Sequence, residues 1–75
     1  MSFAWETTPD DVALVLKRHG VPGNADAILD QYFDEAIFAR IEKQVLRCDD
    51  IDEQTEAAQE EIEIILIELG VLPKI

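Results

Sequence analysis

IDEQTEAAQEEIEIILIEL, the stretch from Ile51 to Leu69, carries the strongest helical periodicity in this chain of 75 residues. Its apolar and small side chains recur at spacings of three and four residues, which places them on one face of a helix: Ile51, Thr55, Ala58, Ile62, Ile65, Leu66 and Leu69. The segment EIEIILIEL also alternates as a strand would, but the helical segment DEQTEAAQEE before it continues the same face. We therefore expect one C-terminal helix, which buries Ile62, Ile65, Leu66 and Leu69.

Signals for a start and a stop flank this helix. Asp50 is followed three positions later by Glu53, which is the spacing of a capping box, and Asp49 with Asp52 offers an alternative register. At the other end, Gly70 suits the left-handed conformation that terminates helices.

The segment TTPDDVALVLKRHGVP, residues 7–22, predicts the first helix. Thr8 is a suitable N-cap, and Pro9 suits the first helical position. Gly20 provides a stop that lets Val21 fold back on Leu16. The inward side chains are expected to be Val12, Val15 and Leu16, with Trp5 lying over them as a lid.

The segment between residues 24 and 47 contains two apolar faces. Asn24 is a suitable cap for ADAILDQYF, in which Ile28, Leu29, Tyr32 and Phe33 share one face. From Ile37 onward the apolar face has rotated away from the first one, and Asp34 offers a new cap. We expect a break at residues 33–35 and a third helix over about residues 35–47. The alternative is one long bent helix.

Length and composition agree with a small helical protein. A chain of 75 residues forms one domain with a thin core, so we expect residues 1–75 to be a single all-α domain. It would contain three to four short helices packed as a bundle, with the C-terminal helix central and packed on the first and third. No secretory signal or membrane span is recognised, and a single cysteine excludes an internal disulfide, so the cytoplasm is the expected compartment.

The net charge of −11 is concentrated near the C-terminus. Residues 1–48 hold eight acidic and five basic residues, a net of −3, whereas residues 49–75 hold nine acidic residues and one basic residue, a net of −8. This charge disfavours direct binding to nucleic acid or to an anionic membrane and favours a protein partner with a basic surface.

The stretch from Cys48 to Glu63 holds eight acidic residues and no lysine or arginine, and we call it the acidic run. Two chemical roles for this run receive little support. An EF-hand reading would take ligands from Asp50, Asp52, Gln54 and Glu61, but Thr55 stands where the loop requires glycine. Carboxylates on the polar face of a small domain also lack the burial that separates an acid from a base. We interpret His19 as a C-terminal helix residue and Cys48 as a packing residue. We expect no enzyme activity, no metal and no cofactor.

The acidic run instead forms a row along the helix. Its members lie opposite the apolar stripe: Asp52, Glu53, Glu56, Glu60 and Glu63. From Glu53 onward they recur every ~5 Å along the axis, which is of the same order as the spacing of phosphates in nucleic acid. Such rows most often serve solubility, although a helix made only for solubility usually interleaves lysine at i+4 for ~0.2–0.5 kcal/mol per pair.

Two isoleucines add an apolar border to this row. Ile64 and Ile67 point away from the predicted core stripe, so the end of the helix is apolar nearly all round. Neighbouring segments, a partner or a second copy would cover them. The leading hypothesis is a non-enzymatic interaction protein that uses the acidic row, including an inhibitor that imitates nucleic acid on a basic groove. The alternative is an assembly module that forms a homodimer through Ile64 and Ile67, with the acidic row serving solubility alone.

The combination of FAWETTPDDVALVLKRHG, residues 3–20, with CDDIDEQTEAAQEEIE, residues 48–63, resembles small acidic proteins of phages and other mobile elements that have no assigned function. This resemblance implies a context in which small inhibitors occupy binding surfaces of host or defence proteins. It implies no functional residues.

Overall fold

The structure is a computed structural model and describes residues 7–74. This part of the chain forms four helices and no strand: α1 (Pro9–Arg18), α2 (Ala25–Tyr32), α3 (Glu35–Val45) and α4 (Ile51–Glu68). The all-α prediction is confirmed, and EIEIILIEL is helical up to Glu68. Helix α3 starts where expected but ends at Val45, two residues before the expected end, because the chain turns toward α4 from Leu46 onward.

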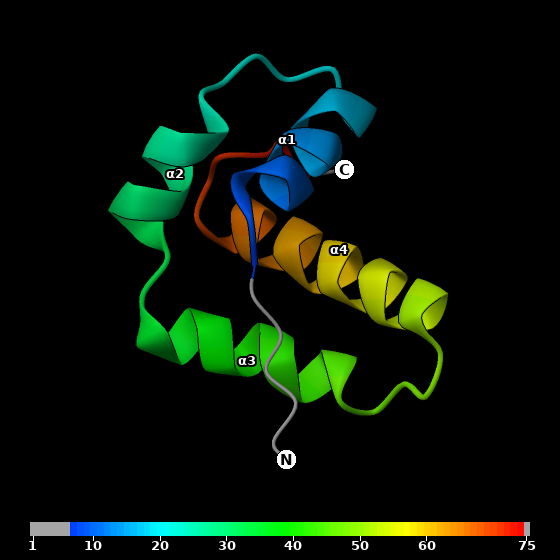
Figure 1. The fold of residues 1–75 in the computed structure, drawn as a ribbon. Coiled ribbons are helices and arrows are strands. Elements are labelled where there is room, and N and C mark those ends of the chain that lie inside the picture. The colour runs from blue at the N-terminus through cyan, green and yellow to red at the C-terminus, as the bar shows by residue number, and fades with distance from the viewer. Residues whose placement is uncertain (1–6, 75) are drawn as a thin grey trace.

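Helix α4 holds the bundle together. It packs against α3 along one side and against α1 along another, while α2 packs on α1 (Figure 1). Helices α3 and α4 run antiparallel, joined by the turn over residues 46–50. The predicted central position of the C-terminal helix, on the first and third helices, is therefore confirmed.

Short side chains set the helix starts, as the sequence indicated. The side-chain oxygen of Asn24 accepts from the backbone N–H of Ala27 at 3.2 Å, and Asp34 accepts from the N–H of Ile37 at 3.0 Å. Phe33 adopts an extended conformation between α2 and α3, which confirms the break and excludes one long bent helix. Asp50 caps α4, so the first of the two registers is correct, although its bond runs to the N–H of Asp52 at 3.3 Å.

The two predicted glycine stops are also confirmed. Gly20 has φ of 65° and Gly70 has φ of 80°, which lie in the left-handed region that other residues avoid. After each glycine the chain folds back on its helix. The N–H of Val21 donates to the carbonyl of Leu16 at 3.0 Å, and the N–H of Val71 donates to the carbonyl of Leu66 at 2.9 Å.

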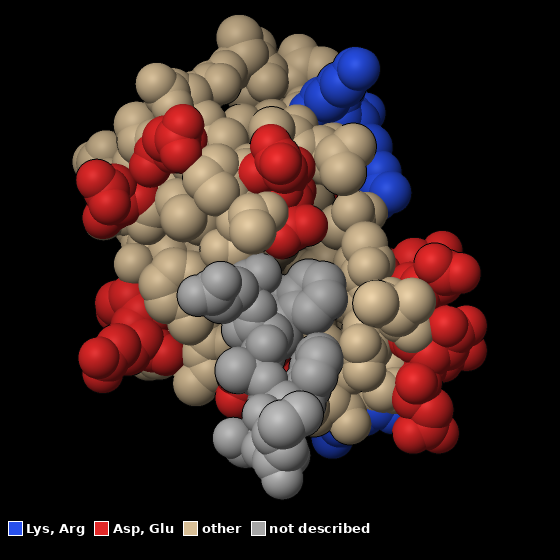
Figure 2. All heavy atoms as spheres, viewed as in Figure 1, with Lys and Arg blue, Asp and Glu red and all other residues tan. Residues whose placement is uncertain are grey.

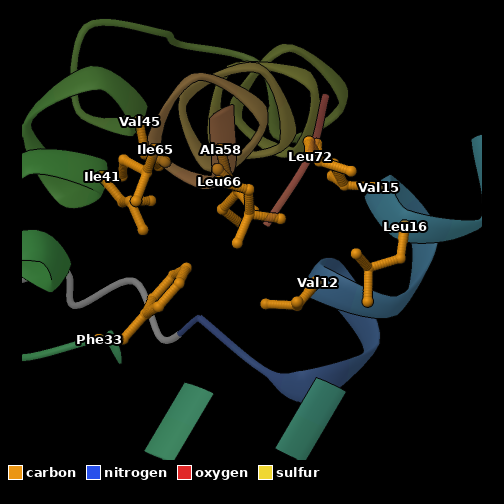
Figure 3. Packing of buried hydrophobic residues seen from close by; sticks show 11 residues of the cluster. Val12, Val15, Leu16, Phe33, Ile41, Val45, Ala58, Ile65, Leu66 and Leu72 are labelled. Carbon is orange, nitrogen blue, oxygen red and sulfur yellow. The ribbon is translucent and has the colours of Figure 1, made fainter. Parts of the chain in front are cut away.

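The core lies where α1 and α3 both cover α4 (Figure 3). It contains eleven buried apolar residues: Val12, Val15, Leu16, Phe33, Ile41, Val45, Ala58, Ile62, Ile65, Leu66 and Leu72. The predicted burial of Leu69 is wrong, because this side chain is 38% exposed at the C-cap of α4. Ile51 lies on the same face but is 71% exposed at the first residue of the helix. Both flank the zone that the neighbouring helices cover.

Leu72, three residues further along the chain, is buried in the core, whereas Leu69 is not. The reversal after Gly70 brings Leu72 back toward the bundle, where it is only 2% exposed.

Tyr32 also departs from expectation, since it is exposed at the end of α2. The proposed lid residue Trp5 lies outside the described residues. Within the described part of the chain, no helix has the length and apolar character needed to cross a membrane.

Candidate functional site

The carboxylates of α4 divide into two sets with different surroundings. The outer set consists of exposed residues that form no ion pair with any residue in the range 7–74: Asp52, Glu53, Glu56 and Glu60. The space-filling view shows acidic atoms gathered over the N-terminal half of α4, on the right of the molecule (Figure 2). We call these four residues the outer acidic row.

The inner set binds neighbouring helices. Arg40 of α3 donates from Nε to Glu61 Oε1 at 2.7 Å and from Nη1 to Glu68 Oε2 at 2.9 Å. The hydrogen bond from Arg40, reinforced by its charge, lowers the pKa of the Glu68 carboxyl below its ordinary value. The bonds to Glu68 and Glu61 raise the pKa of the Arg40 guanidinium. This arginine therefore fastens α3 to α4 at two points.

Glu63 belongs to the inner set, although the sequence placed it in the row. Its Oε1 lies 3.1 Å from Nε2 of His19, at the C-cap of α1, and its side chain is partly buried. Beside it, Arg18 donates to the buried amide oxygen of Gln59 at 2.7 Å. These two contacts fasten α1 to α4, so Glu63 is not free to face a partner as the other four carboxylates are.

The two isoleucines beside the row also have different surroundings. Ile64 is 46% exposed on the same outer face, directly beyond Glu60. Ile67 is partly buried and packs against the core. The apolar end of the outer face is therefore centred on Ile64.

The residues of the EF-hand reading have other partners. Asp50 caps α4, the Gln54 amide donates to the carbonyl of Cys48 at 3.0 Å, and Glu61 binds Arg40. Among residues 7–74, no group of three His, Cys, Asp or Glu side chains is placed to hold a metal ion. The Cys48 thiol is half-buried, and its Sγ lies 3.9 Å from the carbonyl of Gln44.

One shallow hollow lies elsewhere, between the C-terminal end of α1 and the α1–α2 connection. It is lined by Ala13, Leu16, Lys17 and residues 20–23. Lys17 is the ionisable side chain among these residues. A general acid and a general base would have to come from two ionisable groups, so this lining offers no such pair.

Comparisons with protein families, with curated proteins and with solved structures gave no match. The candidate site therefore rests on the chemistry of α4 itself.

Sequence reasoning found the row but missed the bonds that divide it. Arg40 lies 21 and 28 residues away from its two carboxylate partners, and Arg18 lies 41 residues from Gln59. No local pattern signals contacts at such separations. One signal was available: Glu61 and Glu68 are seven residues apart and therefore share a side of the helix.

Proposed function

We propose that this protein is a non-enzymatic interaction module, and that the outer acidic row of α4 binds a basic surface of another protein. The kind of surface that fits best is one that ordinarily binds nucleic acid. A row of carboxylates along a rigid helix presents negative charge at regular intervals, as a phosphate backbone does. By occupying that surface, the protein would act as an inhibitor.

The observation that carries this proposal is the contrast between the two sets of carboxylates. Glu61, Glu63 and Glu68 each have a cationic or histidine partner on another helix. The four residues of the outer acidic row have none among residues 7–74, and they repel one another along the helix. A partner that supplies lysine or arginine would relieve this repulsion.

Ile64 supplies the second element of the surface. Charged groups increase the rate of encounter and select the partner, whereas buried apolar groups supply much of the affinity. Ile64 extends the outer acidic row at its C-terminal end and is half-exposed. A partner would therefore place its bases along the row and an apolar group over Ile64.

The experiment compares two charge variants with the wild-type protein. In the first, Glu53, Glu56 and Glu60 are changed to Gln. In the control, Asp26, Asp30 and Glu35, which are exposed on α2 and at the start of α3, are changed to Asn, Asn and Gln. Both variants lose three negative charges, but the control residues lie on the opposite side of the molecule (Figures 1 and 2).

Each protein is immobilised and exposed to extract of the source cells, and the captured proteins are identified. The purified partner is then titrated with wild-type protein at two salt concentrations, with and without duplex DNA. We expect row neutralisation to raise the Kd at least ~10-fold and to reduce its salt dependence, with DNA competing. Equal binding by the row variant and the control variant would refute the role of the row.

A further inference from the structure

The basic counterpart of the outer acidic row is present on the protein itself, on the adjacent helix. Lys43, in the last turn of α3, and Arg47, in the turn that follows α3, are both exposed and form no ion pair with any residue in the range 7–74. Lys43 lies two residues from the buried Ile41, as Glu60 and Ile64 lie two residues from the buried Ile62. At 100° per residue, all three point away from the core.

The bonds of Arg40 fix the register of these two faces. Because Arg40 reaches both Glu61 and Glu68, it lies level with the middle of that segment of α4. The helices are antiparallel and have the same rise per residue, so later residues of α3 lie level with earlier residues of α4. Lys43 therefore lies about level with Glu60. Arg47 lies beyond the end of α3, in the turn that leads to the N-terminal end of α4. The exposed Ala39 lies level with the segment around Ile64, and the exposed Ala36 lies about one turn further along, level with Glu68.

We propose that this α3–α4 face binds a second copy of the chain. A twofold axis parallel to the helices, between α3 and α4, would lay α3 of each copy on α4 of the other. Rotation about this axis leaves the position of every residue along the helices unchanged. Lys43 of one copy then meets Glu60 of the other, and Arg47 lies toward the N-terminal half of that α4, which carries Glu56. Ile64 meets the small side chain of Ala39, with Ala36 one turn away. Every contact occurs twice, as an isologous interface requires.

Neither the α3 face nor the α4 face could bind a second copy of itself alone. The acidic row of one copy would repel the acidic row of another. The combined face instead has two ridges: a basic ridge with Lys43 and Arg47, formed by α3 and the turn after it, and an acidic ridge with Glu56 and Glu60, formed by α4. The small side chain of Ala39 allows the backbones to approach at the level of the one large exposed apolar side chain of α4 beyond the row, Ile64.

This dimer would cover the surface that the proposed protein partner needs. The partner and the second copy would then compete for Glu56 and Glu60, so the dimer would be the form without inhibitory activity. The self-association itself does not rest on the proposed function. Its test needs only this chain.

The test is a charge exchange followed by sedimentation equilibrium. One variant carries Lys43→Glu and Arg47→Glu, which makes both ridges acidic. The other carries Glu56→Lys and Glu60→Lys, which makes both ridges basic. A control variant carries Asp26→Lys and Asp30→Lys on α2, with the same change of net charge as the second variant. Circular dichroism checks that each variant is helical.

We expect the wild-type protein and the control to be dimers and each ridge variant to be a monomer, with dissociation constants raised at least ~10-fold. An equimolar mixture of the two ridge variants should form a heterodimer, because every basic position then meets an acidic one. The variant with Lys43→Glu and Arg47→Glu should not form a heterodimer when it is mixed with the control variant. A monomeric wild-type protein up to millimolar concentration, or a mixture of ridge variants that stays monomeric, would overturn the proposal. Retained binding of a basic partner in that case would leave the proposed function intact.

Discussion

Single side chains of α4 contribute differently to stability, depending on whether they lie within the part of the helix that α1 and α3 cover or beyond its ends. Ile65 lies within it and is fully buried, whereas Leu69 lies one turn further along on the C-cap. Removing apolar atoms from a closed site costs their transfer free energy and leaves a cavity. Removing them at an open site leaves only water in their place.

Truncation of these two residues should therefore give unequal losses. We expect Ile65→Ala to lower the free energy of unfolding by ~2–5 kcal/mol. Leu69→Ala should lower it by no more than ~1 kcal/mol, as for a surface position. Urea unfolding followed by circular dichroism measures both values. Losses of equal size would show that the C-cap is packed as tightly as the core.

Titration of Glu68 tests the contact between α3 and α4. Arg40 lowers the pKa of this carboxyl, so the contact contributes stability above the ordinary pKa of glutamate, and this contribution is lost as the pH falls through the lowered value. We expect Arg40→Met to return the pKa of Glu68 toward its ordinary value in a carboxyl NMR titration. Lys43→Met, on the same helix, serves as the control, and a Glu68 pKa that moves as much in the control would rule out Arg40 as the cause.

At the scale of the elements, the turn after α4 decides what fills one end of the core. Gly70 has φ of 80°, and the next residues return to Leu66, with N–H bonds from Val71 at 2.9 Å and from Leu72 at 3.2 Å. Leu72 becomes buried as a result. The turn at Gly70 therefore both ends the helix and brings Leu72 into the core.

Replacing Gly70 by alanine should be costly for backbone reasons alone. A Cβ at this position would meet nothing within 4 Å, so the cost comes from the left-handed conformation, about 1–2 kcal/mol. Gly23→Ala is the control, since that Cβ would make contacts of 3.4 Å with Ile28 and Leu16 and the residue has no positive φ. We expect thermal unfolding to show the larger loss for Gly70→Ala. The reverse order would place the strain elsewhere.

The whole molecule carries a charge imbalance that packing does not neutralise. The chain has seventeen acidic residues and six basic ones. Within residues 7–74, three contacts between a carboxylate and a histidine or arginine join α4 to its neighbours. A net charge far from zero destabilises a compact chain through self-repulsion. Salt screens this repulsion, with a Debye length of about 10 Å at 0.1 M.

Stability should therefore rise with ionic strength. We expect the free energy of unfolding to increase by on the order of 1 kcal/mol between 10 and 150 mM NaCl, measured in urea at constant pH. The variant with Glu53, Glu56 and Glu60 changed to Gln should respond less, because part of the repulsion is gone. If salt lowered the stability of the wild-type protein, the attractive contacts of Arg40 and His19 would outweigh the repulsion.

Local chemistry made most of the fold predictable. Asn24, Asp34 and Asp50 cap helices by bonding to N–H groups two or three residues away, and Gly20 and Gly70 end helices through their own backbone conformation. Such interactions depend on neighbours in the chain, so the sequence displays them. The periodicity of residues 51–69 likewise identified Ile62, Ile65 and Leu66 as core.

The sequence by itself thus determined the helices, their breaks and the direction of the buried face of α4. Only the tertiary structure decided where that face stops being covered, which exposes Leu69 and buries Leu72. It also decided which carboxylates of α4 meet a base and which remain in the outer acidic row. The physical reason is that caps and turns act over a few residues, whereas Arg40 and His19 reach α4 only after α1 and α3 have packed against it.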